Sequence, residues 1–277
     1  MPRIKESIHG RLVPIITLQV LTFITWIVGM IIVSTLPESV HSGFVGAPAT
    51  VTFTDILIAS LFFLAFLVLL YLLRNTRAFT IIITVLLALL MLGTATLLIP
   101  YFYALILVIS LALIVITYPT FALNNLFVFL AVLAASLPIG LAYTPLTLFF
   151  PLVFLSVYDV IGVFKTSFIP NLARSAIYQH TPVIILAPAK FKEWLKRPGM
   201  RNIKALPGAG DIFVPLIFLI SVIEHHGNPL LGGWVFIGAV IGSLTNILLL
   251  AQIKKGVPAL PLIVAGMFVA YGFSFLI

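Results

Sequence analysis

The chain has 277 residues, of which 62% are hydrophobic and 8% are charged. A soluble domain carries roughly 25% charged residues, so this composition excludes an ordinary soluble protein and predicts one membrane-embedded domain over residues 1–277. The net charge of +8 does not indicate nucleic-acid binding, because the Lys and Arg residues lie in short connections between apolar runs. Without cysteine the chain has no disulfide, thiolate nucleophile or cysteine-based metal site.

Apolar runs of about 20 residues, the length that a helix needs to cross a bilayer, follow one another along the chain. We predict nine transmembrane helices, at about 12–36, 55–73, 78–98, 101–117, 120–140, 145–165, 206–224, 232–253 and 258–276. The first run is too long for a signal-peptide core and lacks a small-residue cleavage site, so we expect it to be retained. The predicted fold class is therefore an all-α polytopic membrane protein.

Basic residues predict the orientation, because cytoplasmic connections collect Lys and Arg. With nine helices, every basic cluster falls on one side: before the first helix, after the second, in residues 166–205 and after the eighth. This places the N-terminus in the cytoplasm and the C-terminus outside. The long connection, residues 166–205, is ordinarily interpreted as a positively charged loop on anionic headgroups. The alternative is a role in handling substrate.

Two of the acidic residues, Asp159 and Asp211, lie within apolar sequence. An acid inside a transmembrane helix costs roughly 2.5–3.5 kcal/mol, so such residues usually face a polar cavity and mark function. At 1.5 Å per helical residue, Asp159 lies roughly 9 Å from Lys165, and Asp211 about 10 Å from Lys204 if that stretch is helical. Because the sixth and seventh helices run in opposite directions, we expect the two carboxylates to face each other at one depth.

Small residues and prolines surround these acids. The run Gly208-Ala209-Gly210 before Asp211 is expected to permit close approach and backbone conformations that other residues resist. Pro207-Gly208 is expected to delay the start of the seventh helix, and irregular backbone at membrane depth is tolerated where it lines a water-filled cavity. The prolines of Pro258-Ala259-Leu260-Pro261 leave carbonyls unpaired and make the start of the ninth helix rigid.

Three short motifs stand in order on the sixth, seventh and ninth predicted helices: Tyr158-Asp159, Gly208-x-Gly210-Asp211 and Pro258-Ala259-Leu260. Together they resemble the signatures of the presenilin and signal peptide peptidase superfamily, the GxGD intramembrane aspartyl proteases. The resemblance covers the whole topology. Pro261-Leu262 and the cytoplasmic N-terminus are closer to the presenilin branch, and the short chain is similar to compact archaeal homologues. Ala209 departs from the leucine usual in presenilins, a position thought to influence cleavage preference.

The resemblance implies an endopeptidase of the archaeal cell membrane that cleaves transmembrane helices of other proteins. Asp159 and Asp211 would share one proton, one activating a water while the other protonates the scissile carbonyl; the sequence does not say which is the base. Gly208–Gly210 and Pro258–Leu260 would shape the cleft and place substrate. Tyr158 is a candidate hydrogen-bond donor near the pair, although an aromatic residue in a span more often serves core packing. No cofactor or metal is expected. Accessory subunits are not required, and an oligomer is possible.

Other functions remain open at this point. A buried carboxylate pair also suits a proton-coupled transporter or a cation leak channel, although the chain shows no inverted repeat. Prepilin peptidases share Gly-x-Gly-Asp but place a basic residue shortly after the acid, where this chain has Ile212 and Phe213. A catalytically silent scaffold is a third alternative. For the protease, we hypothesise that an extended substrate pairs with a strand edge near Val183–Ala187 or just before Gly208.

Polar and small residues elsewhere in the spans have ordinary interpretations. We expect Asn124 and Asn125 in the fifth helix and Asn246 in the eighth to form hydrogen bonds between helices. Gly238 and Gly242 are one turn apart and are expected to let a neighbouring helix pack closely.

Overall fold

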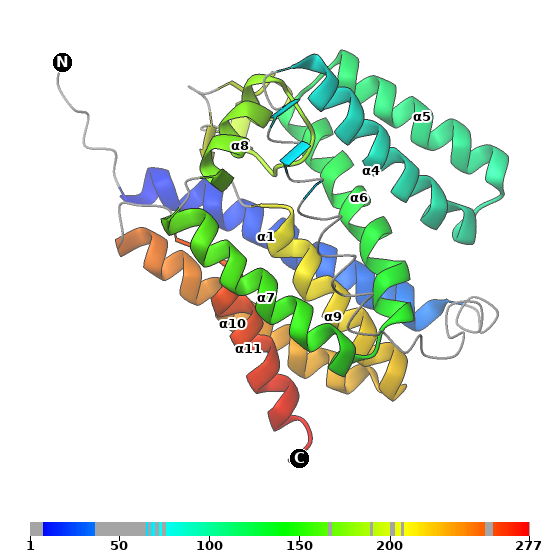
Figure 1. The fold of residues 1–277 in the computed structure, drawn as a ribbon, viewed down its shortest axis with the longest axis vertical. Coiled ribbons are helices and arrows are strands. Elements are labelled where there is room, and N and C mark those ends of the chain that lie inside the picture. Colours follow the sequence, from blue (N-terminus) through cyan, green and yellow to red (C-terminus); the bar gives the residue numbers. More distant parts are fainter. Residues whose placement is uncertain are drawn as a thin grey trace.

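The structure is a computed structural model that describes residues 8–36, 65, 68–69, 72–73, 76–165, 168–188, 191–199, 203–205, 208–252 and 257–276. Eight long helices form a bundle (Figure 1). They are α1 (Ile8–Thr35), α4 (Arg77–Leu98), α5 (Tyr101–Thr117), α6 (Phe121–Ala142), α7 (Pro145–Phe164), α9 (Gly210–His226), α10 (Pro229–Gln252) and α11 (Leu260–Phe273).

These helices match eight of the predicted spans to within a few residues. The second predicted span, 55–73, lies almost entirely outside the described residues, so the count of nine helices and the orientation of the termini stay predictions. Five of the described helices, α1, α4, α6, α7 and α10, are long and apolar enough to cross a membrane, and α5 and α11 are shorter apolar helices. The helical architecture of the prediction is confirmed.

Threonine and proline explain where α6 and α7 begin. The Thr120 hydroxyl accepts a hydrogen bond from the Leu123 N–H at 3.2 Å, and Thr144 caps α7 in the same way through Thr147. Pro145 then occupies the first position of α7, where its missing N–H costs nothing. Pro100 and Pro145 thus lie at boundaries between separate helices.

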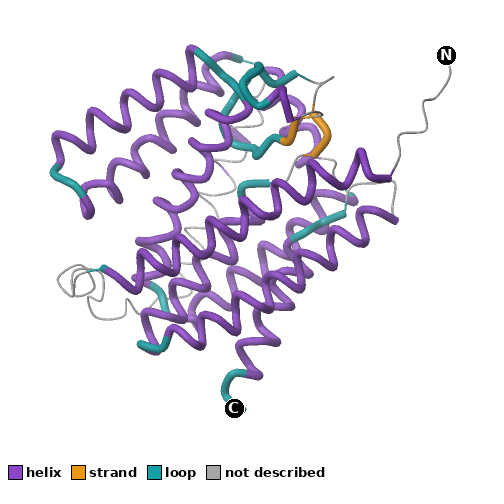
Figure 2. The backbone as a smooth tube through the Cα atoms, turned by 180° about the vertical axis from the view of Figure 1, so that it is seen from behind, coloured by secondary structure: helices purple, strands orange, loops and turns teal. Residues whose placement is uncertain are grey.

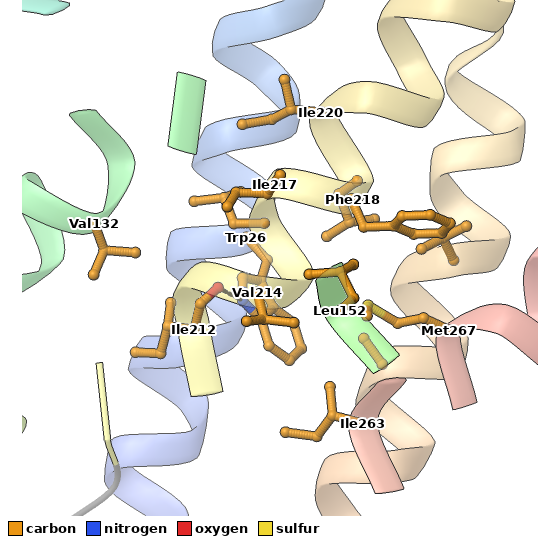
Figure 3. Packing of buried hydrophobic residues seen from close by; sticks show 14 of the residues in the cluster. Trp26, Val132, Leu152, Ile212, Val214, Ile217, Phe218, Ile220, Ile263 and Met267 are labelled. Atoms are coloured by element: carbon orange, nitrogen blue, oxygen red, sulfur yellow. Dashed lines mark hydrogen bonds between the residues drawn. The ribbon is translucent and has the colours of Figure 1, made fainter. Parts of the chain in front are cut away.

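Helix α9 lies at the centre of the bundle and packs against α1, α6, α7, α10 and α11. Its side chains from Val214 to Ile223 are all buried, which leaves no face for solvent or lipid. A helix that is apolar all round belongs in such a position. Figure 3 shows side chains of α9 among those of its neighbours, with Ile212, Val214, Ile217 and Phe218 in the main hydrophobic cluster.

Helices α4 and α5 lie at one side of the bundle and reach the rest of it through α6 (Figure 1). Many large apolar side chains of α5 are exposed, including Phe102 at 66% and Leu107 at 59%. Soluble monomers rarely expose contiguous apolar surface on this scale. We attribute this surface to contact with lipid.

Glycine lets α10 and α11 pack with their backbones in contact. A Cβ added at Gly238 would collide with the Gly266 carbonyl oxygen, and one added at Gly242 would come 2.7 Å from the Cα of Ile263. Side chains larger than hydrogen do not fit at these positions. The prediction that Gly238 and Gly242 serve helix packing is confirmed.

The connection between α7 and α9 is folded. It contains the helix α8 (Phe168–Tyr178), a 3-10 turn (Phe191–Glu193) and two short antiparallel strands, β1 (Ala187–Pro188) and β2 (Ile203–Ala205). Figure 2 shows the strands, in orange, near the N-terminal part of α1, and both strands contact that helix. We call the end of the bundle at which β1 and β2 lie the sheet end.

Helix α9 begins later than the predicted boundary of 206, in agreement with the delay expected from Pro207-Gly208. Residues 203–205 form β2, Gly208 makes an isolated antiparallel bridge with Ile184, and α9 begins at Gly210 instead of 206. An extended chain rises about 3.3 Å per residue, roughly twice the helical rise. The distance of about 10 Å between Lys204 and Asp211 that we derived from helical geometry therefore does not hold.

Candidate active site

Asp211 lies in the first turn of α9, at the sheet end of the bundle. Its Oδ2 accepts a hydrogen bond from the Gly208 N–H at 3.2 Å, and its own N–H donates to the Gly208 carbonyl at 3.1 Å. This reciprocal pair closes the turn before the helix. The N-terminus of a helix also carries the positive end of its dipole, which stabilises a carboxylate there. The delayed start of α9 thus creates a place suited to an acid.

Gly208 and Gly210 leave open space beside Asp211. Both glycines are exposed, and a Cβ added at Gly210 would meet nothing within 4 Å. A Cβ at Gly208 would lie 3.8 Å from the Asp211 Oδ2, an ordinary contact. Neither glycine has a positive φ, so the expected need for unusual backbone conformations is wrong. What these glycines provide is bare backbone that another chain can approach.

Asp159 lies in the last two turns of α7 and is half-buried. It continues a stripe of buried residues at helical spacing, namely Leu148, Leu152 and Ser156, so it faces the bundle and not the lipid. Buried residues spaced three and four apart on α7 therefore determine which way this carboxylate faces.

The carboxylate of Asp159 caps the start of a different helix. Its Oδ2 accepts a hydrogen bond from the Leu260 N–H, the first residue of α11, at 3.2 Å, and the Ala259 N–H also interacts with it. The first N–H groups of a helix have no partner within the helix. Since Pro258 and Pro261 have no N–H, Ala259 and Leu260 are the donors that this turn offers. The Pro-Ala-Leu motif thus holds Asp159 through backbone groups.

The two acids lie close together. Helices α7, α9 and α11 pack against one another, and Asp159 lies within electrostatic range of Asp211. Each carboxylate accepts a backbone N–H near a helix start: Asp211 from Gly208, two residues before α9, and Asp159 from Leu260, the first residue of α11. The three motifs recognised in the sequence therefore meet at one place. Two carboxyl groups with a shared neighbourhood can hold one proton between them.

Trp26 of α1 reinforces the turn that carries Asp211, and no sequence pattern indicated this role. Pro215 cannot donate to the carbonyl of Asp211, four residues earlier, so one helical bond is missing there. The Trp26 indole N–H donates to the next carbonyl, that of Ile212, at 3.0 Å (Figure 3). Trp26 is fully buried. A single tryptophan in an apolar run carries no signal for such a partner.

Tyr158 is half-buried beside Asp159, and its hydroxyl forms no hydrogen bond with any residue that the structure describes. Its expected hydrogen bond near the acids therefore remains a prediction. Ala209 is the N-cap of α9, and its carbonyl accepts hydrogen bonds from Ile212 and Phe213 at 3.1 Å and 2.9 Å. Ala209 therefore has a structural role as the N-cap, and no such role is seen for the Tyr158 hydroxyl among the described residues.

Asn124 and Asn125 do not join helices, contrary to prediction. Asn124 donates to the Ile184 carbonyl at 2.8 Å and Asn125 to the Leu186 carbonyl at 2.9 Å, while the Leu186 N–H donates back to Asn125 at 2.8 Å. Their partners belong to the strand segment of the connection. For Asn246, the side-chain oxygen is buried without a partner among the described residues, so the expected interhelical bond is not seen.

Comparison with known proteins decides the family. The family model of signal-peptide peptidase and presenilin aspartyl protease matches residues 16–277. This chain belongs to that family. No curated protein matches it. A solved structure of a presenilin family intramembrane aspartate protease has a similar fold, with a TM-score of 0.61 and 19% sequence identity over 93% of this chain and 95% of that one.

Membership of the signal-peptide peptidase and presenilin family agrees with the apolar helices, and the chain is an integral membrane protein. The match extends from the middle of α1 to the C-terminus, so it includes α7, α9 and α11 together. The residues singled out in the sequence lie within it. Among the described residues, no group of three His, Cys, Asp or Glu is placed to hold a metal ion.

Proposed function

We propose that the protein is an endopeptidase that hydrolyses peptide bonds within transmembrane segments of other membrane proteins, with Asp159 and Asp211 as its catalytic residues. The observation that carries this proposal is that the carboxylates lie on helices packed against one another and against α11. Asp211 is bound to the Gly208 N–H just before α9, and Asp159 to the Leu260 N–H at the start of α11. Family membership supports an aspartyl protease over a transporter, a channel or a silent scaffold.

The mechanism follows from two carboxyl groups that share one proton. The ionised member removes a proton from a water molecule, and the oxygen of that water forms a bond to the scissile carbonyl carbon. The protonated member donates its proton to the carbonyl oxygen, which gives a gem-diol. Collapse of the gem-diol breaks the C–N bond while a proton passes to the leaving nitrogen. Neither step requires a metal or a cofactor.

The fixed backbone donors serve this chemistry by orienting the carboxylates. The N–H groups at Gly208 and Leu260 each bind Oδ2 of their acid at 3.2 Å. This contact helps to orient each carboxyl group for action on water. Orientation before the reaction lowers the entropic part of the barrier.

The substrate is expected to be an unwound segment that pairs with the sheet end. One edge of Ile184–Leu186 faces the strand of Gly208, and the other edge is bound by Asn124 and Asn125. Within the described part of the chain, β2 pairs with β1 alone, so its other edge has no strand partner there. Of the two strands that the sequence suggested, the one before Gly208 is therefore the better edge for substrate.

Orientation and surroundings complete the proposal. A cytoplasmic sheet end follows from the basic residues of the connection, of which Arg174, Lys192, Lys196 and Arg197 are exposed. These residues would lie near anionic headgroups. Partners are substrate helices and lipid, nucleic acid is not a partner, accessory subunits are not required, and the membrane is that of an archaeal cell.

The test is cleavage of a model transmembrane peptide by purified protein in detergent. Asp159→Ala and Asp211→Ala should each abolish product, since neither acid can do the work of both. The matched control is Glu193→Gln, which removes an acid of the connection and its 3.7 Å ion pair with Lys196 and should cleave as wild type does. Cleavage that survives both Asp substitutions rejects the proposal, and ion flux through liposomes without cleavage would favour a channel.

A further inference from the structure

Asn125 binds a peptide unit as a neighbouring strand would. Its side-chain oxygen accepts the Leu186 N–H at 2.8 Å, and its side-chain nitrogen donates to the Leu186 carbonyl at 2.9 Å. In a sheet, one residue exchanges both of these bonds with a residue on the next strand. Asn124 adds a bond to the Ile184 carbonyl, two residues earlier, at 2.8 Å. These are the alternate residues that face one edge of a strand.

The pair therefore occupies the edge of this segment that the sheet leaves unpaired. Ile184 bridges Gly208, and Ala187 pairs with Ala205, so the opposite edge of the segment faces the strand before α9. An open strand edge can pair with any extended chain. Because Asn124 and Asn125 occupy one edge of the segment, an extended chain cannot pair there. The opposite edge, which faces the strand of Gly208, lies nearer to Asp211.

The hydrogen bonds of Asn124 and Asn125 to this segment are buried, so water cannot replace them. Asn124 is 3% exposed, Asn125 2% and Leu186 4%. Side chains of the segment alternate between two hydrophobic clusters: Ile184 packs with Phe79 and Phe121, and Ile185 packs with the main core. Loss of the asparagine leaves a buried peptide unit without partners, which is more costly than an exposed hydrogen bond.

A second set of bonds fixes the connection to the same helix. The first N–H groups of α6, those of Phe121 and Ala122, donate to the carbonyls of Lys196 and Trp194 at 3.1 Å and 3.0 Å. Helix starts need such acceptors. The first two turns of α6 thus bind the connection at two points. The position of the sheet relative to the bundle is set by α6, which carries neither acid.

We propose that Asn125, assisted by Asn124, is a positioning residue of the protease that holds Ile184–Leu186 against the strand of Gly208 and so sets which substrate bond reaches the two acids. Gly208 is the link, because it pairs with Ile184 and also donates to the Asp211 carboxylate. A shift of the segment displaces both the strand edge and the turn that holds Asp211. This inference rests on the proposed function.

The experiment compares wild type with Asn125→Leu, in which both bonds to Leu186 are lost with little change in volume. We measure cleavage positions by mass spectrometry of the products, kcat and KM for the same peptide, and hydrogen exchange of the backbone over residues 184–188. The expected results are a displaced main cleavage position, kcat/KM lowered about tenfold through the loss of buried hydrogen bonds, and faster exchange over these residues.

The matched control is Asn246→Leu on α10. Asn246 is also a buried asparagine in an apolar helix, but its side-chain oxygen has no partner among the described residues. It should leave the cleavage positions and the exchange at 184–188 unchanged. Asn125→Asp keeps an acceptor for the Leu186 N–H and loses the donor, so its effect should be intermediate. It replaces Asn125→Leu if that variant does not fold.

Three outcomes overturn the inference: wild-type cleavage positions and rate in the Asn125 variants, unchanged exchange, or faster exchange without any change in cleavage. A general loss of stability would lower the yield of active protein without moving the cleavage position, so the position separates the two explanations. If wild type itself cleaves no transmembrane peptide, the proposed function fails. The exchange measurement then still decides whether Asn125 holds the segment.

Discussion

The two helices that carry the acids differ in their surroundings. Helix α9 is buried on every side between Val214 and Ile223, whereas α7 exposes much of its surface, including Phe150 at 69% and Phe154 at 60%. Asp211 therefore lies on a fixed central element and Asp159 on a peripheral one. The hydrogen bond of the Asp159 carboxylate to the start of α11 compensates for this peripheral position, because it restrains the side chain. Alignment of the acids thus depends on α11 as well as on their own helices.

The difference between the two helices predicts unequal costs for removing an aromatic ring. Phe218→Ala in α9 leaves a cavity where the ring packs against Phe268 and Tyr271. We expect a loss of about 3 kcal/mol, the low end for such changes, because lipid removes most of the transfer contribution. Phe154→Ala in α7 should cost less than about 0.5 kcal/mol. Unfolding titrations with a denaturing detergent measure both, and equal costs would contradict the comparison.

The dependence of Asp159 on α11 can be tested from α10, which packs against that helix. In Gly242→Ala, the new Cβ would lie 2.7 Å from the Ile263 Cα and 2.8 Å from the Leu262 carbonyl carbon, so α11 must move. We expect a loss of about 1–3 kcal/mol through overpacking and a fall in peptide cleavage.

Gly233→Ala is the matched control, because a Cβ there meets nothing within 4 Å. It should be neutral or slightly stabilising, since alanine favours helix by about 1 kcal/mol over glycine. Cleavage by Gly242→Ala at the wild-type rate would show that α11 does not position Asp159.

A substitution of Trp26 tests the support of Asp211, the acid on the buried central helix. Trp26→Phe keeps an aromatic ring but removes the donor to the Ile212 carbonyl. The expected cost is about 1 kcal/mol, the usual contribution of one hydrogen bond, with a lower kcat because the Asp211 turn loosens. Trp234→Phe on α10 removes an indole that is 40% exposed and should change neither value. A normal kcat for Trp26→Phe would mean that α9 needs no external support at this turn.

The smallest expected effect lies in the connection between the two helices. Burial, with the positive charge of Arg197, lowers the pKa of His180 below its ordinary value of 6.5. As pH falls below about 6.5, the unfolded chain binds a proton that the folded chain does not, so stability decreases. Above that pH, His180 contributes no pH dependence. Thermal unfolding at a series of pH values should show a shallower decrease for His180→Gln, and an identical curve would contradict this.

The helices could be predicted because their signal is local. Each run of apolar residues is long enough to span a bilayer and is interrupted by proline or polar residues, so α4, α5 and α7 agree with prediction almost to the residue. Asp159 and Asp211 were found for the same reason, since an acid in an apolar run is conspicuous. The delayed start of α9 was expected from Pro207-Gly208, and strand edges were suggested near Val183–Ala187 and before Gly208. Their pairing with each other was not predicted.

The remaining parts of the site depend on contacts between distant residues, which sequence patterns do not contain. Trp26 and Ile212 are 186 positions apart, and Asn125 and Leu186 are 61 apart. The sequence pattern around an asparagine in a helix is the same whether its hydrogen-bond partner is another helix or a strand edge. That choice depends on the packing of the connection against α6.

The most direct test of the account is whether positions 159 and 211 can be joined by a short covalent bridge. The chain has no cysteine, so Asp159→Cys with Asp211→Cys creates one defined thiol pair. If the two side chains lie together, the shortest bifunctional methanethiosulfonate linkers join them, and the fragments stay together after cleavage of the connection. The control pair is Val157→Cys, whose position is 53% exposed on α7, with Asp211→Cys, and it should not be joined. Failure to join positions 159 and 211, or equal joining of both pairs, would contradict the account.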